Sequence, residues 1–309
     1  MVALKEMQAS QKKVWVIGAN SFTGTYLLPM LQRSGYRVDT HTVDITSATE
    51  VEEAVLSICP DYIINLAAIS FVPAGQNASV YAVNTFGPQY ILDACLKLEK
   101  PPLKIILASS ASVYGVQAED KISEECQPNP VDHYGCSKWA MEQIARTYRD
   151  RLNILITRPF NYTGPGQNEK FLIPKIVQHF KDKAATLHLG NLDVARDFSN
   201  VRWIARAYVE LLSLKNESLE DKSLEDNAVG VVNLCSGAMT SIDGVIEILH
   251  KLTGVSLDVE SSAGLVRSSD ILRQCGSNER LYRMLPLLDS PIDIVQTLQQ
   301  MVFEEGVSE

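Results

Sequence analysis

Short apolar runs alternate with amphipathic stretches along the first half of the chain. The strand-like runs cover residues 13–18, 36–40, 61–68, 103–110 and 152–158. Apolar side chains recur at helical spacing over residues 26–31, 50–57, 83–98, 134–149 and 201–214. Strands and helices that alternate at this length predict an α/β protein, built on a doubly wound parallel sheet with helices on both faces.

The alternation loosens after Gly166. Helices are predicted from residue 171 and over residues 241–253 and 292–303, and strands near residues 187–189 and 231–235. The acidic stretch 215–227 reads as a solvated loop. We therefore expect a dinucleotide-binding Rossmann domain, formed by residues 1–159 and about 200–236. Residues of about 160–199 and 237–309 are expected to form a smaller C-terminal substrate-binding lobe.

Composition narrows the function classes. The chain has 309 residues, of which 46% are hydrophobic and 21% charged, a mixture typical of globular proteins. Its net charge of -9 argues against non-specific binding to nucleic acid or to anionic membranes. The six cysteines are scattered without a paired motif, so we expect reduced thiols, a cytoplasmic location and no metal site. No apolar run is long enough to span a membrane.

A glycine turn follows the first strand. Gly18 and Gly24 flank Ala19-Asn20-Ser21-Phe22-Thr23 and lead into a helix, although Ser21 stands where such turns usually have a middle glycine. Strand, glycine turn and helix form an arrangement that lets a pyrophosphate approach the free N–H groups of the helix N-terminus. Because ligands of parallel sheets lie beyond the carboxyl ends of the strands, the loops after Gly18, Ala68, Ser110 and Arg158 are the candidates for a binding site.

Tyr134 and Lys138 provide candidate acid–base chemistry. They lie four residues apart in a predicted helix, so both side chains should share one face. An ammonium beside a phenol favours the phenolate, which would allow proton transfer to or from a substrate oxygen near neutral pH. The alternative is a surface tyrosine beside a solvated lysine. Ser110, at the exit of the strand 103–110, could share the substrate oxygen with the phenol.

Together, Gly18, Gly24, Ser110, Tyr134 and Lys138 resemble the extended short-chain dehydrogenase/reductase family over nearly the whole chain. In the second half, Arg158-Pro159-Phe160-Asn161, Gly164-Pro165-Gly166-Gln167 and Arg196-Asp197-Phe198 are similar to the GDP-sugar branch of that family. This branch contains GDP-mannose 4,6-dehydratases and GDP-4-keto-6-deoxymannose reductases.

The resemblance implies roles for individual residues. Tyr134 would be the acid–base residue, Ser110 would hold the reacting oxygen, and Lys138 would bind ribose and lower the pKa of Tyr134. The implied cofactor residues are Gly18, Asn20, Ser21, Phe22, Gly24, Asp44, Ile45, Leu66, Ala67 and Ala68, together with Tyr134 and Lys138. The implied substrate residues are Ser112, Asn161, Lys175, Asn191, Leu192, Arg196, Arg267 and Asp270.

Two positions depart from the branch. Dehydratases of this group carry an acid two residues after the catalytic Ser or Thr, and here that residue is Ser112; Trp203 stands where relatives commonly have Asp. We therefore expect an NAD(P)H-dependent reductase of a GDP-4-keto-6-deoxy sugar, a hexose or a heptose. A 4-epimerase with bound NAD is the alternative, and a 4,6-dehydratase or an inactive nucleotide sensor is less favoured.

The residues leave the choice between NAD and NADP open, because either Asp39 or Asp44 could be the acid at the end of the second strand. The resemblance also implies a homodimer through helices 83–98 and 134–149.

Overall fold

Six parallel strands form the large sheet of the computed structural model, which describes residues 11–70, 77–214, 230–262 and 271–304. In spatial order they are β2 (Arg37–Asp39), β1 (Lys13–Ile17), β3 (Tyr62–Asn65), β4 (Lys104–Ala108), β5 (Ile154–Pro159) and β9 (Gly230–Leu234). The central strands β1, β3 and β4 are largely apolar on both faces, as a sheet covered on both sides requires. Val14 and Val16 of β1, for example, enter one core, whereas Trp15 and Ile17 enter the other.

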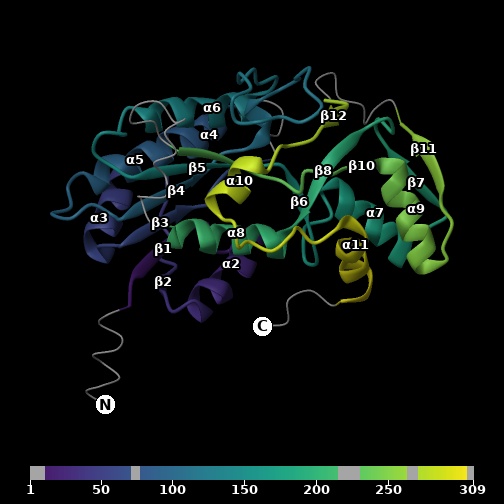
Figure 1. The fold of residues 1–309 in the computed structure, drawn as a ribbon, viewed down its shortest axis with the longest axis horizontal. Helices are drawn as coiled ribbons and strands as arrows, with labels where there is room; N and C mark the ends of the chain where they lie inside the picture. Colours follow the sequence, from purple (N-terminus) through teal and green to yellow (C-terminus); the bar gives the residue numbers. More distant parts are fainter. Residues whose placement is uncertain (1–10, 71–76, 215–229, 263–270, 305–309) are drawn as a thin grey trace, which may run out of the picture.

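Helices cover both faces of this sheet. Helices α2 (Phe22–Arg33) and α8 (Val201–Ser213) pack on one face, and α3 (Ala48–Ile58), α5 (Gly87–Cys95) and α6 (His133–Arg146) lie on the other (Figure 1). The predicted helix 83–98 is divided: α4 (Asn77–Tyr81) and a π-helical segment, η1 (Ala82–Phe86), precede α5, which has a proline in its first turn. The predicted doubly wound parallel sheet is confirmed.

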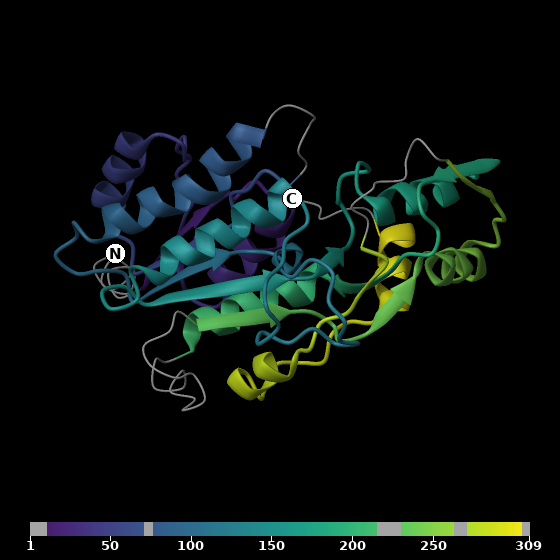
Figure 2. The same cartoon turned by 90° about the horizontal axis from the view of Figure 1, so that it is seen from above.

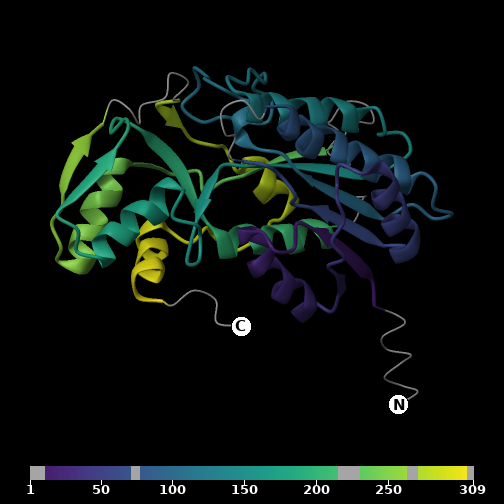
Figure 3. The same ribbon diagram turned by 180° about the vertical axis from the view of Figure 1, so that it is seen from behind.

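A smaller lobe lies to one side of the large sheet (Figures 2 and 3). It contains a four-stranded sheet of β6 (Asn161–Thr163), β8 (Ala195–Asn200), β10 (Met239–Ser241) and β12 (Arg273–Gln274), and a two-stranded sheet of β7 (Thr186–Leu189) and β11 (Asp258–Ser261). Its helices are α7 (Leu172–Lys181), α9 (Ile242–Thr253) and α11 (Ile294–Phe303), which pack around Phe180, Leu249 and Leu298. The lobe therefore has a core of its own.

Helix α10 (Glu279–Met284) corrects one predicted boundary. The prediction placed residues 237–309 in the lobe, yet Leu281, Leu285 and Leu288 lie in the core of the large sheet together with α2 and α8. The short helix belongs there because its apolar side chains fill the face beside β9, and Arg280 Nη1 donates to Val231 O at 3.0 Å. The other predicted domain boundaries stay a prediction.

Trp203 of α8 has a structural role at this junction. Its side chain is buried, and its Nε1 donates to the carbonyl of Asp289 at 2.8 Å. The indole thus ties α8 to the segment that follows α10. The acidic stretch 215–227 lies outside the described residues. Within the described ranges, no helix combines the length and the apolarity that crossing a bilayer requires.

Candidate active site

The glycine turn follows β1 directly. Gly18 has a φ of +79°, and a Cβ there would lie 2.8 Å from Ala67 N; a Cβ on Gly24 would lie 2.1 Å from Ala19 O. Both positions therefore require glycine. Ser21 is the N-cap of α2, because its Oγ accepts the N–H of Gly24 at 3.1 Å. Ser21, which stands where such turns usually have a middle glycine, therefore caps the helix.

The surroundings of this turn fit a dinucleotide. Leu66 N donates to Ile17 O at 2.9 Å, which brings the ends of β1 and β3 together. Leu66 and Ala67 are half-buried, and Asn20 and Ala68 are exposed, so the loops after β1 and β3 both reach the surface beside the start of α2. Free N–H groups at a helix N-terminus favour an anion, and glycines allow its close approach. The turn therefore provides a cradle suited to a pyrophosphate.

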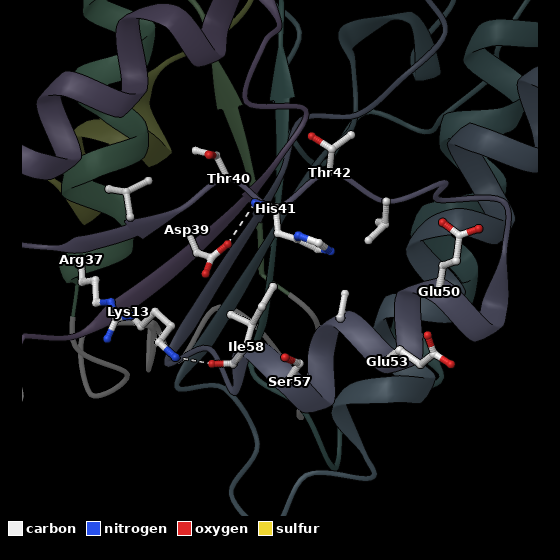
Figure 4. A pocket seen from close by; sticks show the side chains of 13 residues that line it. Lys13, Arg37, Asp39, Thr40, His41, Thr42, Glu50, Glu53, Ser57 and Ile58 are labelled. Atoms are coloured by element: carbon white, nitrogen blue, oxygen red, sulfur yellow. Dashed lines mark hydrogen bonds between the residues drawn. The ribbon is translucent and has the colours of Figure 1, made fainter.

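A charged groove of about 790 Å³ lies beside β2 and α3 (Figure 4). Its lining includes Arg37 and Asp39 of β2, the following His41, and Glu50 of α3. Because β2 ends at Asp39, this carboxylate is the acid at the carboxyl end of the second strand; its Oδ1 accepts the N–H of His41 at 2.9 Å.

Asp44 and Ile45 lie further along the same loop. Asp44 closes a turn, since its Oδ1 accepts from the N and Oγ1 of Thr46 at 2.9 and 2.7 Å, and these bonds lower its pKa. Ile45 is buried among the helices of that face. A Cβ on Gly87 would lie 2.6 Å from Ile45 Cγ1, so α5 passes close to this side chain. Contact of Asp44 and Ile45 with adenine stays a prediction.

Ser110, Ser112 and Tyr134 meet at the N-terminus of α6. Ser110 follows β4 and caps a short 3₁₀ helix, η2 (Ala111–Val113): its Oγ accepts from Ser112 N at 3.1 Å and lies 3.2 Å from Ser112 Oγ. A Cβ on Gly135 would lie 2.6 Å from Ser112 O, so η2 packs directly against the first turn of α6. Asp132 caps α6 by accepting the N–H of Gly135 at 2.7 Å. The Ser110 hydroxyl also lies close enough to Tyr134 to lower the pKa of its phenol.

The protonation of Tyr134 and Lys138 differs from the prediction. Burial raises the pKa of Tyr134 to about 12, although the hydrogen bond with Ser110 opposes that rise. Burial also lowers the pKa of Lys138 to about 8, and its Nζ donates to Ala108 O at 2.7 Å. The expected lowering of the Tyr134 pKa by Lys138 is therefore wrong for this structure, because burial of the phenol dominates. A phenol of this pKa is a proton donor at neutral pH.

Glu142 and Arg158 form a buried ion pair that the sequence reasoning missed. Glu142 lies one helical turn after Lys138; its carboxylate accepts from Arg158 Nε at 2.9 Å and from Nη2 at 2.6 Å, and from Ser109 Oγ at 2.5 Å. Both side chains are almost fully buried. The i, i+4 relation of Glu142 to Lys138 was the available signal, since it places both on one helix face.

Tyr162 of β6 is a second residue that the sequence reasoning missed. Its ring stacks on Phe22 with centroids 6.1 Å apart, and its hydroxyl lies 2.8 Å from Thr23 Oγ1. Tyr162 also raises the pKa of Tyr134, so the two phenols are close. The first turn of α2, the smaller lobe and the Tyr134 phenol therefore converge on one region.

The described substrate-side residues lie in the smaller lobe. Asn161 is exposed on β6, and Arg196 lies on the adjacent β8, where Nη1 donates to Leu272 O at 2.9 Å. Lys175 of α7 donates to His188 O at 2.7 Å, while Asn191 closes the turn that precedes β8 and carries the half-buried Leu192. Their contact with substrate stays a prediction. Arg267 and Asp270 lie outside the described residues.

Enzymes of the short-chain dehydrogenase/reductase class combine this sheet with a Ser–Tyr–Lys set, and the fold and the site place the protein in that class. The chain belongs to the GDP-mannose 4,6 dehydratase family, whose model matches residues 14–284. The predicted resemblance to the GDP-sugar branch is thereby confirmed.

Individual relatives agree with this assignment. The chain is 33% identical over 279 residues to the GDP-6-deoxy-D-talose 4-dehydrogenase of Aggregatibacter actinomycetemcomitans, which covers 88% of this chain and 91% of that relative. It is 32% identical over 234 residues to the GDP-6-deoxy-D-mannose reductase of Pseudomonas aeruginosa, covering 72% and 73% of the two chains. The structure of RMD from Pseudomonas aeruginosa complexed with NADPH superposes with a TM-score of 0.81 at 28% identity, covering 94% of this chain and 97% of that one.

Proposed function

We propose that the protein reduces the 4-keto group of a GDP-4-keto-6-deoxy sugar with a nicotinamide dinucleotide. The family, the dehydrogenase and the reductase among its relatives, and the NADPH-bound neighbour support this reaction class. The observation that carries the proposal is Ser112, whose hydroxyl lies beside Ser110 where a dehydratase would have an acid.

The carboxylates near Tyr134 are already engaged. Asp132 caps α6, and Glu142, the acidic residue within α6, is held by Arg158 and Ser109. Elimination of water needs an acid–base group at the neighbouring carbons, and a serine hydroxyl does not provide one at neutral pH. Reduction of a ketone instead needs a single proton donor. Tyr134 fits that role because its raised pKa keeps it protonated.

Each site residue has a separate role in the proposed reduction. A bound dinucleotide supplies the hydride. Tyr134 donates its phenolic proton to the substrate carbonyl oxygen, and the Ser110 hydroxyl, which follows β4, orients that oxygen. Lys138, held by the Ala108 carbonyl, would bind the nicotinamide ribose. The cradle of Gly18 and Gly24 would hold the pyrophosphate.

Incubation of the protein with GDP-4-keto-6-deoxymannose tests the proposal. We expect stoichiometric oxidation of NADH or NADPH, followed at 340 nm, with formation of a GDP-6-deoxyhexose. GDP-mannose with oxidised dinucleotide is the comparison assay, because a dehydratase would convert this substrate. We expect the protein not to dehydrate it. Conversion of GDP-mannose, or failure to oxidise cofactor with the keto sugar, contradicts the proposal.

A 4-epimerase is the second candidate, because the same Ser–Tyr–Lys set would serve it. Such an enzyme retains its dinucleotide through turnover. Isomerisation of a GDP- or UDP-hexose by protein without added cofactor, together with dinucleotide that co-purifies, would favour epimerisation over net reduction.

Lys138 predicts a pH dependence. Its pKa of about 8 means that the ammonium is present below that value and is lost as pH rises through it. We expect kcat/KM for the dinucleotide to be level in neutral buffer and to fall by about tenfold per pH unit above that pKa, because kcat/KM reports groups of the free enzyme. Tyr134, with a pKa of about 12, stays protonated over this range. A pH profile of kcat/KM that does not decline near pH 8 contradicts the proposed role of the Lys138 ammonium in binding the dinucleotide.

Asp39 predicts a preference for NADH over NADPH. The carboxylate lies at the carboxyl end of β2, where an acid accepts a hydrogen bond from the adenosine ribose and repels a 2′-phosphate. We expect kcat/KM to be higher with NADH, and Asp39→Asn to raise kcat/KM for NADPH by about tenfold, equivalent to about 1.4 kcal/mol. Glu53→Gln is the control, since it removes another carboxylate of the same groove, one that lies on α3 and not at the end of β2. Equal effects of both substitutions would count against Asp39.

A homodimer through α5 and α6 and a cytoplasmic location stay predictions.

A further inference from the structure

The ion pair of Glu142 and Arg158 has no role in the chemistry proposed above, yet it lies directly beneath the catalytic residues. Glu142 shares a helix face with Tyr134 and Lys138, at successive spacings of four residues. Arg158 lies near the end of β5, and Ser109 precedes Ser110 at the end of β4. A single carboxylate therefore contacts the ends of both strands from the helix that carries the phenol.

We propose that Glu142 and Arg158 are positioning residues, which hold α6 against the ends of β4 and β5 so that Tyr134 and Lys138 meet Ser110. Three short hydrogen bonds carry the contact, from Arg158 Nε and Nη2 and from Ser109 Oγ. A forked guanidinium–carboxylate contact specifies both distance and orientation, which a single apolar contact does not. The pair therefore sets the rotation and the height of the helix relative to the sheet.

The energetics favour a positioning role over a purely stabilising one. Burial of two charges is expensive, and replacing such a pair by uncharged residues of similar volume is often neutral for stability. Arg158 Nη1 is in addition buried without a hydrogen-bond partner among the described residues, although the guanidinium lies 4.7 Å from the centroid of the Tyr114 ring. An unsatisfied buried donor costs about 1–3 kcal/mol. A pair selected for stability alone has no reason to retain that cost.

The same carboxylate also acts on Lys138. Burial disfavours the lysine ammonium, and the negative charge of Glu142 opposes that effect. The titratable and charged groups that face this region are Tyr134, Lys138 and Glu142 from α6, Arg158 from β5, and the Tyr114 phenol from the segment after β4. Removing both charges of the pair leaves Lys138 without its favourable neighbour, so its pKa should fall.

The double variant Glu142→Gln/Arg158→Met tests the proposal, because it removes both charges and keeps an oxygen for Ser109. We expect the thermal midpoint to stay near that of the wild type, since uncharged replacements of a buried pair are often neutral for stability. We expect kcat to fall by about 10–100-fold, since a displacement of about 1 Å can reduce rates by that factor. The alkaline limb of kcat/KM should also move to lower pH.

A second variant tests the proposal if the double variant does not fold. Ser109→Ala keeps the ion pair and removes the hydrogen bond from Ser109 to Glu142. We expect kcat to fall by about threefold to tenfold with little change in thermal midpoint.

Tyr148→Phe is the matched control. It removes the hydrogen bond from the Tyr148 hydroxyl, just after α6, to Asp93 on α5, at 2.6 Å, and it leaves the contacts of Glu142 with Ser109 and Arg158 intact. We expect it to leave kcat unchanged.

The outcomes separate this inference from the proposed function on which its assay rests. A wild-type protein that does not oxidise dinucleotide with the keto sugar overturns the proposed reductase. An active wild type overturns the positioning role in any of three cases: the folded double variant keeps kcat within about twofold, Ser109→Ala leaves kcat unchanged, or Tyr148→Phe lowers kcat as much as the pair variants do.

Discussion

Tyr134→Phe should abolish most reductase activity while leaving dinucleotide binding intact. The phenol is the proton donor in the proposed reaction, and general acid catalysis contributes about 10²–10⁴-fold to rate. We therefore expect kcat to fall by about 10³-fold. The ring remains, so packing at the start of α6 and the thermal midpoint should change little. The measurements are single-turnover oxidation of dinucleotide with the keto sugar and a dinucleotide titration by fluorescence.

Tyr282→Phe provides the comparison for this substitution. Tyr282 also loses a hydrogen bond, from its hydroxyl to Asp289 O at 3.2 Å, but it lies on α10, against a different part of the large sheet. We expect its kcat to equal that of the wild type. Full activity of Tyr134→Phe would falsify the proton-donor role, and a loss of dinucleotide affinity equal to the loss in rate would show that the phenol serves binding.

The sequence was most informative where chemistry and periodicity coincide. Tyr134 and Lys138 could be placed on one helix face because their spacing alone determines it, and the apolar runs on both faces of β1 and β4 indicate a covered parallel sheet. The Gly18–Gly24 turn could be recognised for the same reason, since close backbone approach requires glycine at fixed positions.

Other features depend on tertiary contacts that no spacing shows. Strand β8 is one example, because its polar composition does not predict a strand; it carries Arg196, Asp197, Ser199 and Asn200. The strand is held in place through the buried Asp197 carboxylate, which accepts hydrogen bonds from the N–H groups of Ser236, Gly237 and Gly276. The pairing of Arg158 with Glu142 could not be predicted from the sequence, because burial of a charged pair is uncommon and depends on what packs around it.

Protonation was the least predictable property of the site. The spacing of Tyr134 and Lys138 correctly brings them to one face, but it does not reveal that Lys138 is buried and Tyr134 partly buried. Burial disfavours the charged form of each group, so it raises the pKa of the phenol and lowers that of the ammonium. A protonated tyrosine is an acid, which is the role that the proposed reduction of a ketone requires.

The largest structural effect is expected from Gly24→Ala. The new Cβ would lie 2.1 Å from Ala19 O, which is a backbone atom and cannot rotate away, so the turn itself must shift. Overpacking of this kind costs about 1–3 kcal/mol or more. Because the shift moves the backbone that would contact the pyrophosphate, we expect the dinucleotide Kd to weaken by about 100-fold, equivalent to about 2.8 kcal/mol, with a lower thermal midpoint.

Alanine substitutions at Gly18 and Gly35 distinguish the effect of a steric clash on dinucleotide binding from the effect of backbone strain. Both have a positive φ, +79° and +85°, but a Cβ at Gly18 would lie 2.8 Å from Ala67 N, whereas a Cβ at Gly35 would meet nothing within 4 Å. Each alanine substitution carries a left-handed strain of about 1–2 kcal/mol. Only Gly18→Ala should also weaken dinucleotide binding, because only there must β1 and β3 move apart. If Gly18→Ala and Gly35→Ala lower the thermal midpoint equally and both leave the Kd unchanged, the cradle is not the dinucleotide site.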